Sequence, residues 1–489
     1  MNVHTRPLLC DTVLRVQDLC IELVPNRTAP GGRTLLQGCH FDLRAGERLT
    51  LVGESGAGKS LLAQAIMGTL PAVMRASGQV QIAGRDTNGQ RGRTQPLWGS
   101  QIVMLPQEPW TALNPVMRLR TQVAEAGRYA SGHSWANAFE RAEQHLTALG
   151  LPGAGRLWLH QVSGGMAQRV GMACASQSDA PVLIADEPTK GLDTDACEQV
   201  AVLLANAQRQ GQALLTITHD LDLALRLGGR VAVMRQGSIV ETGEVATVLR
   251  APRHPYTQEL VAAQPRHWPR LAPSRPVPHD DFALVAKQVC VRFDQRTVLQ
   301  DTSLPIATGE LVAVVGPSGC GKTTLGNVLV GALQPGQGTV QRRPGVPAWR
   351  FQKLYQDPIA SFAPGQTIRR GMHDLLRLHR LDGTPIACWL QRLRLSDDLL
   401  DRLPSEVSGG ELQRLAMLRA MLLQPVFVFA DEPTSRLDAL TQRDTMAALC
   451  DAMAAGGCAM LLVSHDPDLA RKATHRQWRF TQGQLQAAD

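Results

Sequence analysis

The sequence predicts two α/β domains in tandem, each built on a mainly parallel β-sheet with helices on its faces. A glycine-rich octet of the same pattern occurs at residues 53–60 and 316–323, and three further motifs follow in the same order in each half. In each half, apolar strand-like runs such as residues 48–52 and 213–218 alternate with longer helical patterns and glycine-marked turns. Because the repeat distance is about 250 residues, we expect two complete domains rather than a solenoid of short repeats.

The composition is that of an ordinary globular protein. Hydrophobic residues make up 44% of the 489 residues, enough for compact cores. No apolar run approaches the roughly 18 residues that span a bilayer, and residues 1–9 lack the apolar region of a secretory signal. Ten cysteines without a C-x-x-C pair are typical of a reducing compartment. We therefore expect a cytoplasmic protein without a structural metal site. The net charge is +7, but the basic residues are scattered along the chain, so the charge does not argue for a nucleic-acid partner.

A proline-rich segment separates the two halves. Residues 265–278 contain five prolines and no apolar period that would form a helix or strand. Such a composition is typical of a semi-rigid linker. We therefore expect a first domain at residues 1–264, a linker at 265–281 and a second domain at 282–489.

Both octets fit the pattern G-x-x-x-x-G-K-[ST], which binds phosphate groups. Each octet follows an apolar strand-like run and precedes a helical run, which is the setting that this chemistry requires. Glycines let backbone N–H groups surround the β- and γ-phosphates, lysine supplies a compact charge, and the last hydroxyl reaches Mg²⁺. The residues assigned to phosphate binding are Gly53, Ser55, Gly56, Gly58, Lys59 and Ser60 in the first octet, and Gly316, Ser318, Gly319, Gly321, Lys322, Thr323 and the following Thr324 in the second.

Lysine is rare in this chain. Only six of the 50 basic residues are lysines, and two of the six, Lys59 and Lys322, occupy the octets. A chain that otherwise uses arginine keeps lysine where a point charge is needed, which a planar guanidinium does not replace.

Two buried-type strands end in an Asp-Glu pair. Residues 181–185 precede Asp186 and Glu187, and residues 426–430 precede Asp431 and Glu432. Taken alone, Asp-Glu-Pro is more often the start of a solvated loop, but its place after such a strand and downstream of a phosphate loop favours a catalytic role. In this chemistry the Asp holds the Mg²⁺ shell and the Glu orients the attacking water.

A histidine closes another apolar strand in each half. His219 follows residues 213–218, and His465 follows residues 459–464. A single strand-end histidine is usually structural, but the duplicated setting favours a catalytic role in which each histidine reaches a γ-phosphate.

Four motifs occur in the same order in both halves. The octet comes first, followed by Val-Ser-Gly-Gly-x-x-Gln-Arg at 162–169 and 407–414, Asp-Glu-Pro-Thr-x-x-Leu-Asp at 186–193 and 431–438, and the strand-end histidine. This arrangement resembles the nucleotide-binding domains of ABC ATPases over nearly the whole chain. The resemblance implies two P-loop NTPase domains, each with an antiparallel β subdomain and a helical subdomain. It also implies that each Ser-Gly-Gly helix start binds the ATP held by the opposite domain, in a head-to-tail pairing within one chain.

The resemblance implies two composite sites, both complete and both binding ATP and Mg²⁺. The catalytic residues are Glu187 and His219 in site one and Glu432 and His465 in site two. Site one joins Lys59, Ser60, Gln107, Asp186, Glu187 and His219 to Ser408, Gly409 and Gly410, whereas site two joins Lys322, Thr323, Gln356, Asp431, Glu432 and His465 to Ser163, Gly164 and Gly165. The implied Mg²⁺ ligands are Ser60, Gln107 and Asp186, and Thr323, Gln356 and Asp431.

The chain departs from the family pattern at two kinds of position. Phe293 stands where an aromatic ring stacks on adenine in the second half, but Leu23 occupies that place in the first. In the loop after each Asp-Glu-Pro-Thr, Lys190 and Arg436 replace the usual small residues.

Three segments indicate the subfamily. Residues 105–115 resemble the glutamine loop of the oligopeptide, dipeptide and nickel importer ATPases, and residues 355–358 open the equivalent loop of the second half. Residues 253–260 resemble the C-terminal extension of that group. The resemblance implies an ATPase that powers import of peptides or nickel and other metal-chelate complexes. The implied partners are two integral-membrane permease subunits and a periplasmic or lipid-anchored substrate-binding protein, which places the chain at the cytoplasmic face of the inner membrane.

Two other functions are open to the superfamily. The first is a soluble tandem ATPase acting on ribosomes or nucleic acid. Ribosome-acting members have a long charged helical linker and DNA-repair members have zinc cysteines, and neither pattern occurs here. The second is a sugar importer with paired ATPase domains, which usually has one degraded site. We therefore expect a peptide-type or nickel-type importer with no nucleic-acid partner.

Overall fold

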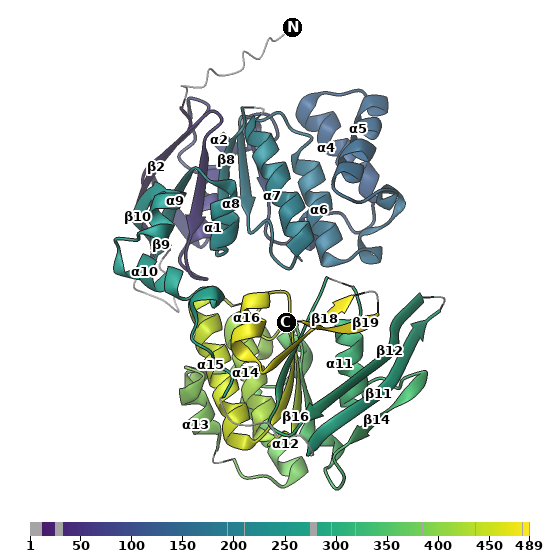
Figure 1. The fold of residues 1–489 in the computed structure, drawn as a ribbon. Helices are drawn as coiled ribbons and strands as arrows, with labels where there is room; N and C mark the ends of the chain where they lie inside the picture. The colour runs from purple at the N-terminus through teal and green to yellow at the C-terminus, as the bar shows by residue number, and fades with distance from the viewer. Residues whose placement is uncertain are drawn as a thin grey trace. The chain divides into compact units, whose positions relative to one another are not determined.

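The computed structural model describes residues 12–24, 33–192, 194–209, 211–273, 281–294, 296–317, 319–383, 385–435, 437–481 and 483–488. The chain divides into two compact units, Met1–Val261 and Ala262–Asp489. Each unit combines a mainly parallel sheet, a separate antiparallel sheet and a group of helices (Figure 1). The predicted duplicated α/β fold is therefore confirmed.

The central sheet of the first unit has the strand order β10-β9-β3-β8-β7-β6. Strands β6, β7, β8, β3 and β9 pair in parallel, and β10 pairs antiparallel with β9. Strand β7 is buried at every position, as expected for a parallel strand with both faces covered. The strands span Arg48–Val52 (β3), Ile102–Leu105 (β6), Val182–Asp186 (β7), Ala213–Thr218 (β8), Arg230–Arg235 (β9) and Ser238–Glu244 (β10).

An antiparallel sheet of order β2-β1-β4-β5 and a group of helices complete the first unit. Figure 1 shows β2 near one end of this unit and α4 and α5 at the other. The strands are Thr12–Leu23 (β1), Thr34–Arg44 (β2), Met74–Ile82 (β4) and Arg85–Asp86 (β5). The helices are Lys59–Met67 (α1), Arg91–Thr94 (α2), Pro109–Ala112 (α3), Leu119–Ser131 (α4), Trp135–Ala148 (α5), Gly164–Ala175 (α6), Thr194–Arg209 (α7), Leu221–Leu227 (α8), Val245–Arg250 (α9) and Pro255–Ala262 (α10).

The second unit repeats this plan. Its central sheet has the order β15-β16-β17-β13-β18-β19, and its antiparallel sheet has the order β12-β11-β14. The strands are Phe282–Phe293 (β11), Arg296–Ala307 (β12), Leu311–Val315 (β13), Gln337–Arg342 (β14), Phe351–Leu354 (β15), Phe427–Asp431 (β16), Ala459–Ser464 (β17), Arg476–Thr481 (β18) and Gln484–Ala488 (β19). The helices are Lys322–Val330 (α11), Ile368–His379 (α12), Pro385–Arg392 (α13), Gly409–Leu422 (α14), Ala439–Gly456 (α15) and Pro467–Ala473 (α16).

The first part of the expected linker packs on the second unit instead of forming a free connection. Residues Pro265–His267 form a short 3₁₀ helix, and the Trp268 side chain is only 1% exposed within the second unit's core. The N–H groups of Leu271 and Ala272 both donate to the carbonyl of Lys472. The apolar Trp268 and Leu271 explain the difference, because burying them outweighs the loop character that the prolines suggest. Residues 274–280 of the expected linker lie outside the described residues.

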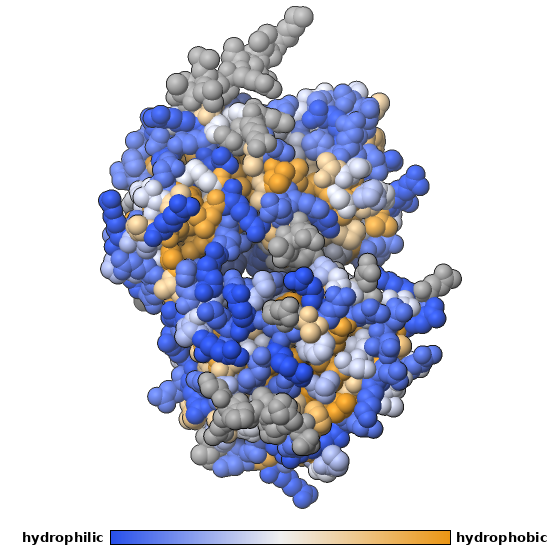
Figure 2. Space-filling view, viewed as in Figure 1, coloured by the Kyte–Doolittle hydropathy of each residue, from blue (hydrophilic) through white to orange (hydrophobic). Residues whose placement is uncertain are grey.

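Figure 2 shows one face of the protein, which is mainly hydrophilic, with smaller apolar patches in each unit. Within the described ranges, none of the helices has the length and apolar character needed to cross a bilayer.

Candidate functional site

Each glycine-rich octet connects the end of a central strand to the start of a helix. Gly58 and Gly321 are the residues before α1 and α11, with φ angles of 100° and 117°. A side chain at Gly58 would meet Leu36 Cδ2 at 2.4 Å, and one at Gly321 would meet Val298 Cγ1 at 2.9 Å. Glycine is therefore required at both positions by backbone conformation and by space.

The octet lysines are buried and held by their own loops. Lys59 Nζ donates to the carbonyls of Gly53 and Glu54, both at 2.8 Å, and is only 6% exposed. Lys322 Nζ donates in the same way to the carbonyls of Gly316 and Pro317, also at 2.8 Å. Both lysines thus lie across their loops, where a phosphate would compete with carbonyl oxygens for the ammonium group.

The other octet residues lie around these lysines. Ser55, Gly56 and Gly319 are exposed, and Thr324 lies in the first turn of α11. Ser318 lies outside the described residues.

The structure brings the octet hydroxyl next to the strand-end aspartate in both halves. Ser60 Oγ donates to Asp186 Oδ1, and Thr323 Oγ1 donates to Asp431 Oδ1, each at 3.2 Å. Burial raises the pKa of Asp186 to about 6, with the neighbouring Glu187 charge adding to the effect, and burial also raises the pKa of Asp431. In both halves the cost of burying the aspartate charge exceeds what its neighbours offset, as the raised pKa values show. A buried carboxylate of this kind beside a hydroxyl is suited to bind a cation.

These donors fit Mg²⁺. Mg²⁺ keeps several waters and substrate phosphates and needs only one or two protein oxygens, which is the number that each hydroxyl and aspartate supply. Among the residues that the structure describes, no cluster of three or more His, Cys, Asp or Glu side chains forms an all-protein cage. When bound with ATP, Mg²⁺ would neutralise charge that develops on the β- and γ-phosphate oxygens.

The glutamate after each aspartate contacts the strand-end histidine. His219 Nδ1 lies 3.0 Å from Glu187 Oε1, and His465 Nε2 lies 2.5 Å from Glu432 Oε1. Burial alone would raise the pKa of Glu187, but the charge and hydrogen bond of His219 outweigh it and lower this pKa. The pKa of His219 is raised because Glu187 outweighs the opposite effect of burial. Both shifts favour a carboxylate in its ionised form, which is the form that orients and polarises a water molecule.

Both glutamates have a left-handed backbone. The φ angles are 49° at Glu187 and 48° at Glu432, a region that costs a non-glycine residue free energy. Their N–H groups donate to the carbonyls of Ile217 and Val463 on the neighbouring strands, which holds them in place. The two halves therefore fix the carboxylate in the same strained position.

The glutamine loops differ between the halves. Gln356 Nε2 donates to Glu432 Oε2 at 2.9 Å, whereas no hydrogen bond joins Gln107 to Glu187 in the described part of the first half. In that half, Lys190 Nζ lies 3.7 Å from Glu108 of the glutamine loop. The sequence identified Lys190 as a departure from the family pattern, but it did not indicate that Glu108 is its partner. Asp193 and Arg436 lie outside the described residues.

Each Ser-Gly-Gly motif begins a helix. Ser163 Oγ accepts a hydrogen bond from Met166 N at 3.3 Å at the start of α6. Ser408 begins α14 with a capping box, because its Oγ accepts from Glu411 N and its own N–H donates to the Glu411 carboxylate. A side chain at Gly164 or Gly409 would meet open space, so both helix starts are accessible to an anion. Gly165 and Gly410 follow in the first turns of these helices.

The two candidate adenine positions differ as the sequence indicates. Phe293 ends strand β11 and is 50% exposed, so its ring is open to a base. Leu23 ends strand β1 and is partly buried.

We predict that site two binds ATP more tightly than site one by about 0.5 to 1.5 kcal/mol, because only Phe293 offers an aromatic face to adenine. Nucleotide affinities measured on full-length chains with Lys59→Ala or Lys322→Ala would separate the two sites. Phe293→Leu should remove the difference and Leu23→Phe should reduce it. Equal affinities before these changes would show that another group stacks on the base in the first half.

Comparison with known proteins decides the family. A profile described as ABC transporter matches residues 36–190 and 299–435. The chain belongs to the ABC transporter family. The ABC domains are ATPases, and each match spans one of the two phosphate loops and its Asp-Glu pair. A second profile, described as oligopeptide/dipeptide transporter, C-terminal region, matches residues 240–284.

Similar proteins of the ABC family are import or transport ATP-binding proteins. The chain is 34% identical to the peptidoglycan transport ATP-binding protein YejF of Agrobacterium fabrum, covering 95% of this chain and 89% of that protein. It is 32% identical to the glutathione import ATP-binding protein GsiA of Salmonella typhi, covering 91% of this chain and 81% of GsiA. The identity to GsiA of Shigella flexneri is also 32%, with 99% and 87% covered. These relatives support an importer ATPase.

Solved structures share the tandem fold. The RNase-L inhibitor matches with a TM-score of 0.65 and 19% identity, covering 91% of this chain and 87% of that chain. The archaeal ribosome recycling factor aABCE1, in complex with the stalk protein aP1, matches with a TM-score of 0.67 and 19% identity, covering 95% and 89%. At this identity the likeness concerns the fold alone.

Proposed function

We propose that this chain is the ATP-hydrolysing subunit of a peptide importer. The observation that carries the proposal is the match of residues 240–284 to the C-terminal region of oligopeptide/dipeptide transporters. In the structure this segment includes α10, which packs as part of the first unit. The relatives named for glutathione import and peptidoglycan transport agree with a peptide-type solute better than with nickel.

The proposed reaction is ATP hydrolysis at two sites. In each site the octet N–H groups and lysine would bind the phosphates, and the hydroxyl–aspartate pair would hold Mg²⁺. Glu187 or Glu432 would then orient the attacking water and accept its proton, with the paired histidine holding the carboxylate. Support comes from the Ser60–Asp186 and His219–Glu187 contacts and from their counterparts in the second half.

The same proposal includes pairing of the two halves. Ser163 and Ser408 would each face the ATP bound by the other half, because their helix starts are capped yet accessible and suit an anion. Hydrolysis would then require both halves. The proposed partners are two membrane permease subunits and a substrate-binding protein, with the chain peripheral at the cytoplasmic face of the inner membrane.

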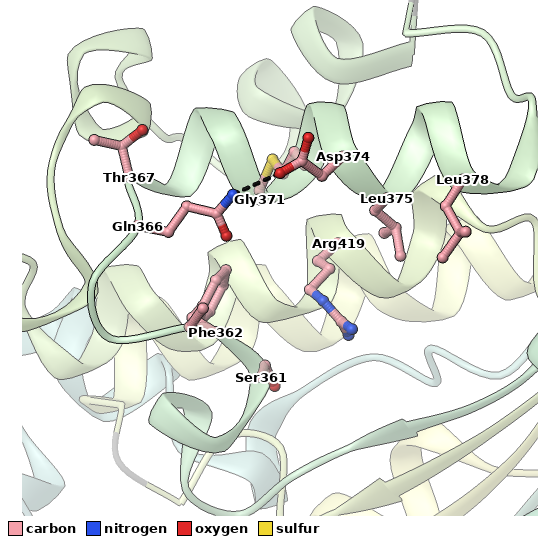
Figure 3. Close-up of a pocket in the computed structure, with 11 residues that line it drawn as sticks. Ser361, Phe362, Gln366, Thr367, Gly371, Asp374, Leu375, Leu378 and Arg419 are labelled. Carbon is pink, nitrogen blue, oxygen red and sulfur yellow. Dashed lines mark hydrogen bonds between the residues drawn. The ribbon is translucent and has the colours of Figure 1, made fainter.

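We propose that permease contacts reach site two through the glutamine loop. Gln356 donates to Glu432, and five residues later, from Ser361 on, the same loop lines a cavity of about 260 Å³ between itself, α12 and α14 (Figure 3). Gln366 Nε2 donates to Asp374 Oδ2 at 2.6 Å across the rim of this cavity. Apolar side chains such as Phe362 and Leu378 supply most of the lining, which suits a protein segment that inserts a hydrophobic side chain.

Filling this cavity should uncouple the permease from the ATPase. A side chain at Gly371 would have Gln366 Oε1 as its nearest neighbour, at 3.8 Å, so Gly371→Ala is a tolerated control and Gly371→Leu occupies the space. We expect Gly371→Leu to lower the permease-stimulated rate by about 5-fold or more, equivalent to about 1 kcal/mol, the cost that truncation of a contributing interface residue exceeds, while the rate of the isolated chain stays unchanged. ATPase rates of the chain alone and of the complex copurified from membranes would show this. An equal loss in both preparations would contradict the proposed docking site.

The alternative function is a soluble tandem ATPase acting on ribosomes. The fold likeness to aABCE1 permits it, but that likeness concerns the fold alone. The match of residues 240–284 to a transporter region and the import relatives favour the importer.

A further inference from the structure

The C-terminal extension contacts the phosphate loop of the first half. Tyr256 lies on α10, and its hydroxyl oxygen accepts a hydrogen bond from the N–H of Glu54, the second residue of the octet, at 3.0 Å. The two residues are 202 positions apart in the sequence. Tyr256 is 1% exposed, whereas Glu54 is only partly buried, so the bond lies at the edge of the buried region.

The Glu54 backbone connects several residues of the phosphate loop. Its carbonyl accepts from Lys59 Nζ at 2.8 Å and from the N–H of Ala57 at 3.2 Å. Since the hydroxyl of Tyr256 binds the N–H of the same residue, both backbone groups of Glu54 have defined partners. A change at Tyr256 would therefore alter the backbone that positions Lys59.

Neighbouring residues fix Tyr256 in turn. The Glu241 carboxylate accepts from the N–H groups of Arg253 and His254, at 2.9 and 3.1 Å, and so secures the start of α10. The guanidinium of Arg235, at the end of β9, lies 4.9 Å from the centre of the Tyr256 ring. The tyrosine is thus held from its own helix and from the central sheet.

The second half has no N–H at the octet position that Glu54 occupies in the first half. The position of Glu54 is occupied there by Pro317, whose carbonyl accepts from Lys322 Nζ as that of Glu54 does from Lys59. Proline has no N–H to satisfy, and its ring fixes φ. A loop with proline therefore has no donor at this position, whereas the loop with glutamate has a partly buried N–H that finds its acceptor in Tyr256.

We propose that Tyr256 is a positioning residue for the ATP site of the first half, and that the C-terminal extension thereby controls nucleotide affinity at this site alone. The hydroxyl holds the Glu54 backbone so that Lys59 and the loop N–H groups face the phosphates. This inference rests on the proposed nucleotide site at Lys59.

The test uses the full-length chain with Lys322→Ala, so that only the first site binds nucleotide. Tyr256→Phe removes the hydroxyl and keeps the ring. We expect it to raise the Kd of a fluorescent ATP analogue with Mg²⁺ by about 3- to 10-fold, the range for losing one intramolecular hydrogen bond. In a Lys59→Ala chain, where only the second site binds, the same change should leave the Kd unchanged.

Two changes at Glu54 distinguish this role from general packing. In a Glu54→Pro chain, which lacks the N–H as the second half does, Tyr256→Phe should have no further effect. In a Glu54→Ala chain, which keeps the N–H, Tyr256→Phe should still weaken binding. An unchanged Kd in the Lys322→Ala chain, or an equal loss in the Glu54→Pro chain, would refute the inference. If the Lys322→Ala chain binds no nucleotide before Tyr256 is changed, the site assignment fails and the inference with it.

Discussion

Glu187→Gln should slow ATP hydrolysis at the first site by at least about 100-fold, the lower range for removing a general base. The amide cannot accept a proton from water, while Lys59, Ser60 and Asp186 are unchanged, so ATP should still bind. Glu432→Gln should have the same effect at the second site. The measurement is the turnover of full-length chains in which the lysine of the other site is alanine.

Retained ATP binding is the control for this prediction. Glutamine has nearly the shape of glutamate and can keep a hydrogen bond to His219 or His465, so the strained backbone should persist. Turnover that stays within a few-fold of the parent would assign water activation to another group. A chain that no longer binds nucleotide would show that the glutamate holds the site together instead.

Lys59→Arg should lower ATP affinity at the first site by about 10- to 100-fold even though the positive charge is kept. Lys59 Nζ is buried and donates to two loop carbonyls at 2.8 Å, a position made for a compact ammonium group. A guanidinium is larger and planar and would displace the loop. Equilibrium binding of an ATP analogue to full-length chains with Lys322→Ala would measure the loss.

A matched comparison separates charge from shape. Lys59→Ala removes both the charge and the shape of the lysine. Lys190→Arg changes a partly exposed lysine outside the octet that pairs with Glu108. If shape matters, Lys59→Arg should resemble Lys59→Ala, and Lys190→Arg should resemble the parent. Near-normal affinity of the Lys59→Arg chain would mean that charge alone suffices.

Local sequence patterns were enough to predict the elements that form each half. The buried run ending at Asp186 forms β7, and the octet at 53–60 leads into α1, because apolar strands and glycine-marked turns leave few alternatives. Parallel strands place their carboxyl ends at one edge of the sheet, so the contact between Ser60 and Asp186 follows from the fold. The chemical role of these residues stays a prediction until it is measured.

Features that depend on distant contacts were not predictable from local patterns. The proline content of residues 265–278 suggested a linker, yet Trp268 within this segment is buried in the second unit. His219 uses Nδ1 and His465 uses Nε2 toward their glutamates, a difference that depends on side-chain rotation. The bond between Glu54 and Tyr256 joins segments far apart in sequence, and its only local signal is the exchange of Glu54 for Pro317 between otherwise similar octets.

The most direct test of the proposed function is to identify what the tagged full-length chain binds in its own cells. The chain would be purified from detergent-solubilised membranes, and its partners identified by mass spectrometry together with the ATPase rate of the complex. We expect stoichiometric membrane proteins with several spans, and an ATPase rate above that of the isolated chain. Copurification with ribosomal proteins, without a multi-span membrane protein, would contradict it.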